Sequence, residues 1–154
     1  MRGDSRRVLE YAEGVVTLCE RYGFAYYGDW ARVLIGWVRG QEEPTGSIQM
    51  IESALERLDA QRAHARRPYY LSLLADTYRR AGQTDRAASI VDTAIEMALA
   101  RGDAWWLPAL FLQKSELGPA AERDTSLRRG LEVAQAQHSL SLAQRLNAAM
   151  SATT

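Results

Sequence analysis

The spacing of apolar residues restricts this chain to a helical fold. Apolar side chains recur every three or four residues along almost the whole sequence, and no segment of useful length alternates with a period of two. The first spacing places apolar side chains on one face of an α-helix, whereas a half-buried β-strand requires the second. The chain of 154 residues is long enough to bury a hydrophobic core. Because its apolar spacing is helical throughout, we expect an all-α protein.

Glycine and proline divide the chain into helix-sized segments. Gly23, Gly40, Gly82 and Gly102 each follow a segment with helical periodicity. Pro108 falls near the first turn of the helix expected over 104–116, so the start of that helix is predicted to be kinked or delayed. The connections are short, which favours antiparallel packing of successive helices. We expect about seven or eight helices in all.

The segment 68–101 carries the most informative pattern. Small residues stand where two paired helices would approach closely, and larger residues stand where they would fill the space between pairs. The pattern comprises Leu71, Leu74, Ala75 and Tyr78 on the first helix, Gly82 at the turn, and Ala87, Val91 and Ala94 on the second. It resembles the tetratricopeptide repeat (TPR), a helix hairpin of about 34 residues.

Related patterns precede and follow this segment. Residues 24–61 form a looser repeat and residues 104–137 form another. Residues 5–22 resemble the second helix of a partial repeat, and residues 139–150 resemble a closing helix. We therefore expect residues 1–154 to form a single TPR-like domain, in which antiparallel helix hairpins stack into a right-handed superhelix.

Aromatic residues open the leading helix of each repeat. Adjacent helix positions are about 100° apart, so one member of an aromatic pair can pack between repeats while the other faces the concave groove of the stack. The alternative is that these aromatics serve packing alone. In TPR geometry, the residues predicted to line the groove and bind a partner are Trp30, Trp37, Tyr69, Ser72, Asp76, Arg79, Trp105 and Leu112.

A further resemblance covers most of the chain. Its carrying segments are Gly23-Phe24 with Trp30 and Gly36-Trp37, 67–75, 81–83, 102–106 and 127–134. Residues 23–142 resemble the C-terminal helical region of bacterial regulators that join a STAND-type ATPase to a LuxR-type DNA-binding domain or an adenylate/guanylate cyclase domain. The resemblance implies a sensor and protein-binding arm. The sequence lacks the phosphate-binding loop, cyclase domain and helix-turn-helix, so the other activities do not carry over. The chain is either part of such a regulator or a short relative.

No catalytic or metal-binding pattern was found in the sequence. The single lysine, Lys114, follows no glycine-rich loop, and no Gly-x-Ser-x-Gly sequence occurs. His64 and His138 are far apart and have no companions at metal-ligand spacing. Cys19 lies on an apolar stripe, which indicates a buried thiol. We expect a non-enzymatic protein without a metal or cofactor.

Charge and hydropathy narrow the partners and the compartment. Acidic and basic residues balance at 19 each, so the chain lacks the net positive field on which nucleic-acid binding depends. No apolar run approaches the roughly 20 residues that span a bilayer, and no secretory segment follows Arg6-Arg7. These features predict a cytoplasmic protein with no direct contact with nucleic acid or membrane.

Two functions fit this pattern. The first is a protein-binding or regulatory module, belonging or related to a bacterial signalling or transcription regulator, that binds a peptide or partner helix in its groove. The second is sensing of a small-molecule effector held among Trp30, Trp37, Tyr69 and Trp105. An enzyme is the least supported alternative.

The first helix also predicts self-association. It resembles the second half of a repeat whose first half is missing, and terminal repeats normally need a polar cap. Its apolar stripe of Val8, Tyr11, Val15 and Cys19 would then be partly uncovered. We expect a second copy or a larger parent protein to cover it.

Overall fold

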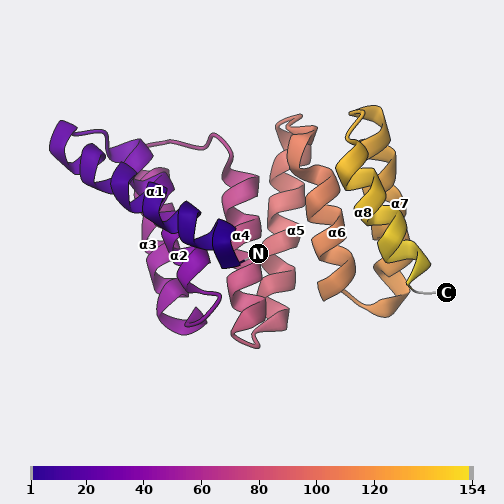
Figure 1. The fold of residues 1–154 in the computed structure, drawn as a ribbon. Helices are drawn as coiled ribbons and strands as arrows, with labels where there is room; N and C mark the ends of the chain where they lie inside the picture. Colours follow the sequence, from indigo (N-terminus) through magenta and orange to yellow (C-terminus); the bar gives the residue numbers. More distant parts are fainter. Residues whose placement is uncertain (1, 153–154) are drawn as a thin grey trace. The chain divides into compact units, whose positions relative to one another are not determined.

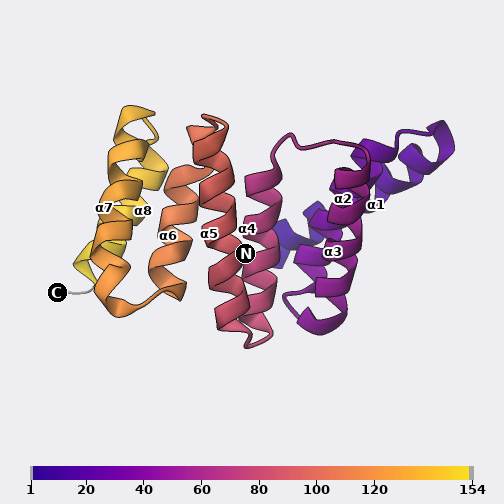
Figure 2. The ribbon, with the colours of Figure 1, turned by 180° about the vertical axis from the view of Figure 1, so that it is seen from behind.

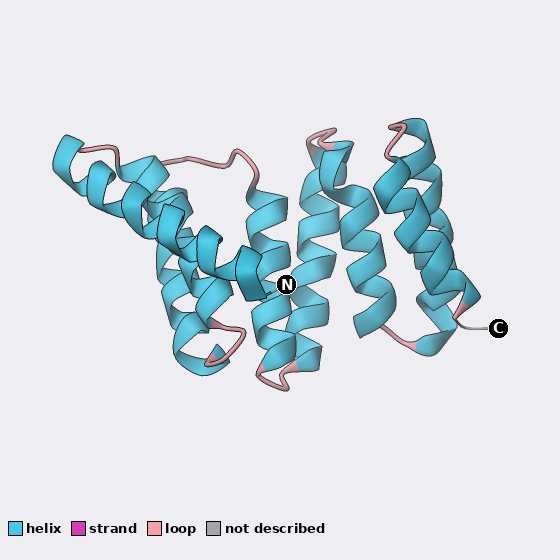
Figure 3. Cartoon of the chain, viewed as in Figure 1, coloured by secondary structure: helices cyan, strands magenta, loops and turns pink. Residues whose placement is uncertain are grey.

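Helices account for all the regular secondary structure of the described residues, which are 2–152 in the computed structural model (Figure 3). This confirms the predicted all-α, helix-hairpin fold and the expected number of helices. The elements are α1 (Arg2–Tyr22), α2 (Ala25–Arg39), α3 (Pro44–Ala60), α4 (Arg67–Arg80), α5 (Thr84–Ala100), the 3₁₀ helix η1 (Ala104–Trp106), α6 (Leu107–Leu117), α7 (Ala120–Ala136) and α8 (Leu140–Ser151). No helix among these residues is long and apolar enough to cross a membrane.

The chain divides into two compact units, one ending at Gln83 and the other beginning at Thr84. Helices α1 to α4 form the first unit, and α5, η1 and α6 to α8 form the second (Figure 1). The division falls inside the segment 68–101, so the two helices of that predicted repeat belong to different units. The predicted single domain and the handedness of its superhelix stay predictions.

Successive helices of the first unit run antiparallel. Glu13, near the middle of α1, pairs with Arg39 at the end of α2 at 2.9 Å, while Glu20 near the end of α1 pairs with Arg32 at 2.8 Å. Between α1 and α2, Ala12 packs with Ala31 and Ile35, and all three are buried. The small residues Ala12 and Ala31 therefore stand where these two helices approach each other.

Gly36 allows a close approach between α2 and α3. A Cβ atom built on Gly36 would lie 2.6 Å from Cγ1 of Ile51, which leaves no room for a side chain. Figure 2 shows α3 alongside α2 from the opposite side to Figure 1. At the start of α3, the Glu43 carboxylate accepts a hydrogen bond from the Gly46 backbone N–H, and Pro44 occupies the first turn. The helix therefore begins where the sequence provides a cap.

The predicted helix-ending glycines behave in two ways. Gly82 and Gly102 adopt left-handed φ angles of 76° and 67°, the conformation in which glycine closes helices. Gly40 also ends a helix, but with a right-handed φ of −64°. A Cβ atom there would lie 2.8 Å from Cγ2 of Thr77, so Gly40 is required for the close approach of α2 to α4 and not for a left-handed turn.

The second unit has its own core around α6, α7 and α8. Leu112, Leu127, Ala134 and Leu146 form its buried cluster. The predicted delay at Pro108 is confirmed, because residues 104–106 form a 3₁₀ turn and α6 begins only at Leu107.

Candidate binding face and aromatic pocket

The leading helices α2 and α4 lie side by side and run in the same direction. The indole Nε1 of Trp37, near the end of α2, donates a 3.0 Å hydrogen bond to Oδ2 of Asp76, near the end of α4. At the opposite ends of the helices, Tyr26 and Trp30 line the same cavity as Tyr70. All six groove residues predicted in the first unit lie on these two helices. We call the surface that they form the α2/α4 face; they are Trp30, Trp37, Tyr69, Ser72, Asp76 and Arg79.

Asp76 is the centre of a polar network on this face. Its carboxylate also accepts hydrogen bonds from Nη2 of Arg79 at 2.8 Å and Nε of Arg80 at 2.9 Å. Burial raises the pKa of Asp76, but hydrogen bonds from Arg79, Trp37 and Arg80 outweigh burial and hold the pKa below the ordinary value of 3.8. Asp76 is therefore a fixed anion that orients two guanidinium groups and one indole.

The predicted groove positions of α4 are accessible positions of that helix, whereas on α2 the residues Tyr27 and Arg39 are more exposed than Trp30 and Trp37. Trp30, Trp37, Tyr69, Ser72 and Asp76 are half-buried and Arg79 is exposed, whereas the intervening Leu71, Leu73, Leu74 and Ala75 are buried. Helical periodicity thus separated the accessible residues of α4 from the core residues. Tyr69 has a raised pKa, because burial outweighs the opposite effect of Arg66.

The two groove residues predicted in the second unit, Trp105 and Leu112, differ in their exposure to solvent. Trp105 is 69% exposed and lies on the 3₁₀ turn that precedes α6. Leu112 is only 6% exposed and packs with Leu127 and Leu146, so its assignment to a binding groove is wrong. The physical reason is that α7 and α8 cover the side of α6 on which Leu112 lies.

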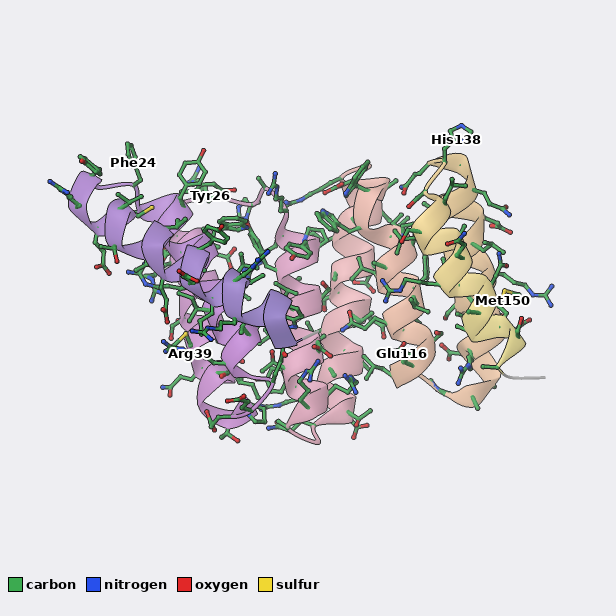
Figure 4. The ribbon with its side chains drawn as sticks, in the orientation of Figure 1. Phe24, Tyr26, Arg39, Glu116, His138 and Met150 are labelled. Carbon is green, nitrogen blue, oxygen red and sulfur yellow. The ribbon has the colours of Figure 1, made fainter. Side chains whose placement is uncertain are left out.

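A cavity of about 310 Å³ opens at the start of α2 and α4. Its lining residues, which we call the aromatic pocket, are Tyr26, Tyr27, Trp30, Ala65, Arg66 and Tyr70. The rings of Tyr26 and Tyr27 pack edge to face, with their centroids 5.0 Å apart. In Figure 4, Tyr26 lies at the same end of the first unit as Phe24, and Arg39 lies toward the other end.

Two buried polar atoms have no hydrogen-bond partner among the described residues: the Tyr70 hydroxyl and Trp30 Nε1, which belong to residues near the aromatic pocket but have almost no accessible surface. Tyr70 is fully buried, and burial together with the neighbouring Tyr26 raises its pKa. Tyr26 is near enough for this effect, but no hydrogen bond of normal geometry joins the two hydroxyls. An unpaired buried polar group costs about 1–3 kcal/mol, so both atoms need an explanation.

Asp29 is a buried carboxylate that the sequence analysis missed. It is 2% exposed and accepts hydrogen bonds from Arg57 at 2.6 Å, Gln61 at 3.0 Å and Arg32 at 3.1 Å. A cavity of about 650 Å³ adjoins this cluster. Because both carboxylate oxygens are paired, we interpret Asp29 as a structural tie between α2 and α3. The signal that could have revealed it is that Asp29 is the single acidic residue of α2.

The residues considered for catalysis or metal binding are dispersed. Cys19 is buried against Gly28, and His64 lies 3.6 Å from the carboxylate of Asp59. Within residues 2–152, no group of three or more His, Cys, Asp or Glu residues is placed to hold a metal ion.

The apolar stripe expected on the first helix is only partly uncovered. Tyr11 is 73% exposed, Val8 and Val15 are half-buried, and Cys19 is buried. Leu18 and Tyr22 are also exposed, on the same helix. Self-association through this helix stays a prediction, and Cys19 is not part of the exposed surface.

Comparisons with protein-family models, with curated proteins and with solved structures found no match to this chain. The resemblances to TPR proteins and to bacterial regulators therefore rest on the sequence segments named above.

Proposed function

We propose that this chain is a non-catalytic, TPR-like protein-binding module whose α2/α4 face binds a peptide or a partner helix. The observation that carries the proposal is the parallel pairing of two leading helices, joined by the Trp37–Asp76 hydrogen bond. Consecutive leading helices that run side by side form the binding surface of TPR-type proteins. The accessible aromatic and charged side chains on this face are the kinds of residue that dominate protein interfaces.

The charges of the face favour an acidic partner. Arg79 and Arg80 share the single carboxylate of Asp76, so this end of α4 carries an excess positive charge. An acidic side chain of the partner can replace Asp76 as the ligand of Arg79, whose side chain is well exposed. The expected partner is therefore a peptide or helix that offers a carboxylate beside an apolar group for Tyr69 or Trp37.

Alanine substitution on the face tests the proposal. In a peptide-array or pull-down experiment with the full chain, Tyr69→Ala and Arg79→Ala are expected to weaken binding of any acidic peptide that the wild type retains. Arg128→Ala is the matched control, because Arg128 also pairs with a nearby aspartate on its own helix but lies in the second unit. Binding that Tyr69→Ala and Arg79→Ala leave unchanged would overturn the proposal.

The resemblance to bacterial regulators supports a cytoplasmic role in signalling or transcription control. In that role the chain is a regulatory arm that contacts protein, without direct contact with nucleic acid or membrane. The balanced charge counts of the sequence support this exclusion of nucleic acid. Cell fractionation of the tagged chain tests the cytoplasmic location, and retention in the membrane fraction would contradict it. A DNA mobility assay tests the absence of contact with nucleic acid, and a shifted DNA band would contradict that absence.

The second candidate is small-molecule sensing, and the aromatic pocket favours it. A ligand site is concave, largely apolar, and contains a few polar groups in fixed positions. The aromatic pocket is concave and is lined by four aromatic residues and one charged residue, Arg66. Of the four residues expected to hold an effector, only Trp30 lines this pocket. A ligand at about 100 times its Kd adds roughly 2.7 kcal/mol of stability, so a thermal-shift screen tests the proposal.

A further inference from the structure

The cavity beside the buried Asp29 has the size of a ligand site. Its volume of about 650 Å³ lies within the usual range of about 300 to about 1,000 Å³. We call it the Asp29 cavity; its charged lining residues are Glu20, Asp29, Arg32 and Arg57, and glycine or alanine accounts for four others. The cavity therefore combines small apolar walls with charges of both signs.

Asp29 positions two side chains of α3 at this cavity. Its Oδ1 accepts a hydrogen bond from Nε of Arg57 at 2.6 Å, and its Oδ2 accepts one from Nε2 of Gln61 at 3.0 Å. Asp29 itself is only 2% exposed, so its carboxylate acts within the protein and does not meet a ligand. The carboxylate fixes the guanidinium and the amide side by side, which lowers the entropic cost of binding to them.

Arg57 offers accessible hydrogen-bond donors at the cavity. Its side chain is 47% exposed, and no described residue accepts a hydrogen bond from its Nη1 or Nη2. These two nitrogens form a planar fork that pairs with both oxygens of a carboxylate. Helix α2 also begins at the cavity, with Ala25, and the positive end of its dipole favours an anion. A carboxylate can therefore bind to Arg57 without displacing Asp29.

Two exposed side chains offer acceptors at the same cavity. Gln61 directs its N–H group to the carboxylate of Asp29, which leaves Oε1 of Gln61 as an acceptor. Glu20 pairs with Arg32 through Oε1 at 2.8 Å, its side chain is 65% exposed, and no described residue donates to its Oε2. Helices α1 and α3 end at the cavity, so the negative ends of both dipoles lie there. An ammonium group suits these acceptors.

The balance of charge distinguishes the possible ligand classes. Two guanidinium groups and two carboxylates give the lining no net charge. A ligand with only a negative charge would meet the carboxylate of Glu20, and a ligand with only a positive charge would meet the guanidinium of Arg57. A molecule with one charge of each sign, close together, satisfies both side chains. No aromatic residue lines the cavity, so its walls do not select a flat ring.

We propose that the Asp29 cavity binds a free α-amino acid, whose carboxylate pairs with Arg57 and whose ammonium group pairs with Glu20 and Gln61. The two charged groups of an α-amino acid share one carbon atom, and the side chains of Arg57 and Gln61 are held together by one carboxylate. This site goes beyond the functions proposed above, because neither the α2/α4 face nor the aromatic pocket contains these residues.

Thermal-shift measurements with the full chain and each standard L-amino acid at millimolar concentration select the probe. Calorimetric titration then compares that amino acid with its amide, which lacks the carboxylate, and with its deamino acid, which lacks the ammonium group. For leucine, these two compounds are leucinamide and isocaproate. We expect the amino acid to bind at least about ten-fold more tightly than either compound, as for the loss of a hydrogen bond to a charged group.

Two conservative substitutions each remove one half of the recognition, and each is expected to weaken binding of the amino acid by at least about ten-fold. Glu20→Gln should no longer distinguish the amino acid from its deamino acid. Arg57→Lys keeps a positive charge beside Asp29 but loses the fork, so it should distinguish the amino acid from its amide less than the wild type does. Glu13→Gln and Arg39→Lys are the matched controls, since these residues form another α1–α2 ion pair, at 2.9 Å, outside the cavity.

The site is excluded if no standard amino acid raises the unfolding temperature, or if the amino acid binds no better than its amide or its deamino acid. Wild-type affinity in both Glu20→Gln and Arg57→Lys would also overturn the inference, because the ligand would then bind elsewhere. Thermal unfolding without ligand verifies that each variant folds. If Arg57→Lys does not fold, Glu20→Gln decides the question by itself, because the Glu20 side chain is exposed.

Discussion

The indole Nε1 of Trp37 donates a 3.0 Å hydrogen bond to Oδ2 of Asp76, a residue 39 positions further along the chain. This contact joins α2 to α4 across a half-buried face. Asp76 also holds Arg79 and Arg80, so the bond connects the packing of the first unit to the charged part of its proposed binding surface.

Removing the indole donor is expected to weaken the first unit. Trp37→Phe keeps an aromatic ring but loses the hydrogen bond to Asp76, so we expect the free energy of unfolding to fall by about 1 kcal/mol. Urea denaturation measures the change. Trp105→Phe alters an exposed tryptophan and is expected to stay within about 0.5 kcal/mol of wild type. Equal stability of the two variants would contradict a contribution from the bond.

Asp76 is expected to make stability depend on acid pH. Its folded-state pKa lies below the ordinary 3.8, so the unfolded chain binds a proton at Asp76 more readily than the folded chain. The stabilisation is complete above the unfolded pKa and is lost as pH falls through the folded pKa. Urea midpoints measured from neutral pH downward should therefore converge for wild type and Asp76→Asn below about pH 3.8. A constant difference between the two proteins would contradict this assignment.

Gly36 and Gly14 offer a matched pair of substitutions in helix interiors. Gly36→Ala introduces a methyl group 2.6 Å from Cγ1 of Ile51, and overpacking of this kind costs about 1–3 kcal/mol. A Cβ atom on Gly14 meets no described atom within 4 Å, so Gly14→Ala should gain about 0.5–1 kcal/mol from helix propensity. Thermal or urea unfolding distinguishes the opposite signs, and a stabilising Gly36→Ala would refute the close approach.

Loss of the Asp29 carboxylate is expected to loosen α3 from α2. Asp29→Asn leaves Arg57 and Gln61 without their anionic acceptor. Because the Arg57 side chain is 47% exposed, water compensates part of the loss, and we expect a decrease of about 2 kcal/mol. Asp124→Asn breaks an exposed pair with Arg128 and should change stability by less than about 0.5 kcal/mol. Similar effects of both substitutions would show that Asp29 is not a structural tie.

Two tyrosines of α4 should respond in opposite directions to loss of their hydroxyl groups. Tyr70→Phe removes a buried hydroxyl without a described partner, so the ligand-free protein should keep its stability or gain up to about 1 kcal/mol. Tyr78→Phe removes a 2.5 Å hydrogen bond to Glu52 of α3 and should lose about 1 kcal/mol. Urea denaturation without added ligand compares them, and a destabilised Tyr70→Phe would indicate that its hydroxyl already has a partner.

Local sequence determined the helices, their ends and much of the α2/α4 face. Apolar spacing predicts a helix because it depends only on residues three or four apart, and Gly82 and Gly102 end helices because glycine alone enters the left-handed region freely. The same periodicity separates the accessible Tyr69, Asp76 and Arg79 from the buried residues between them.

Tertiary structure decided which helix faces are covered. Leu112 was predicted to be accessible, but α7 and α8 bury it. Asp29 finds Arg57 and Gln61 on α3, at separations of 28 and 32 residues, and the aromatic pocket joins the start of α2 to Arg66 and Tyr70. Helical spacing fixes which residues share a face, but burial and hydrogen bonding depend on the element that packs against that face, which no local spacing specifies.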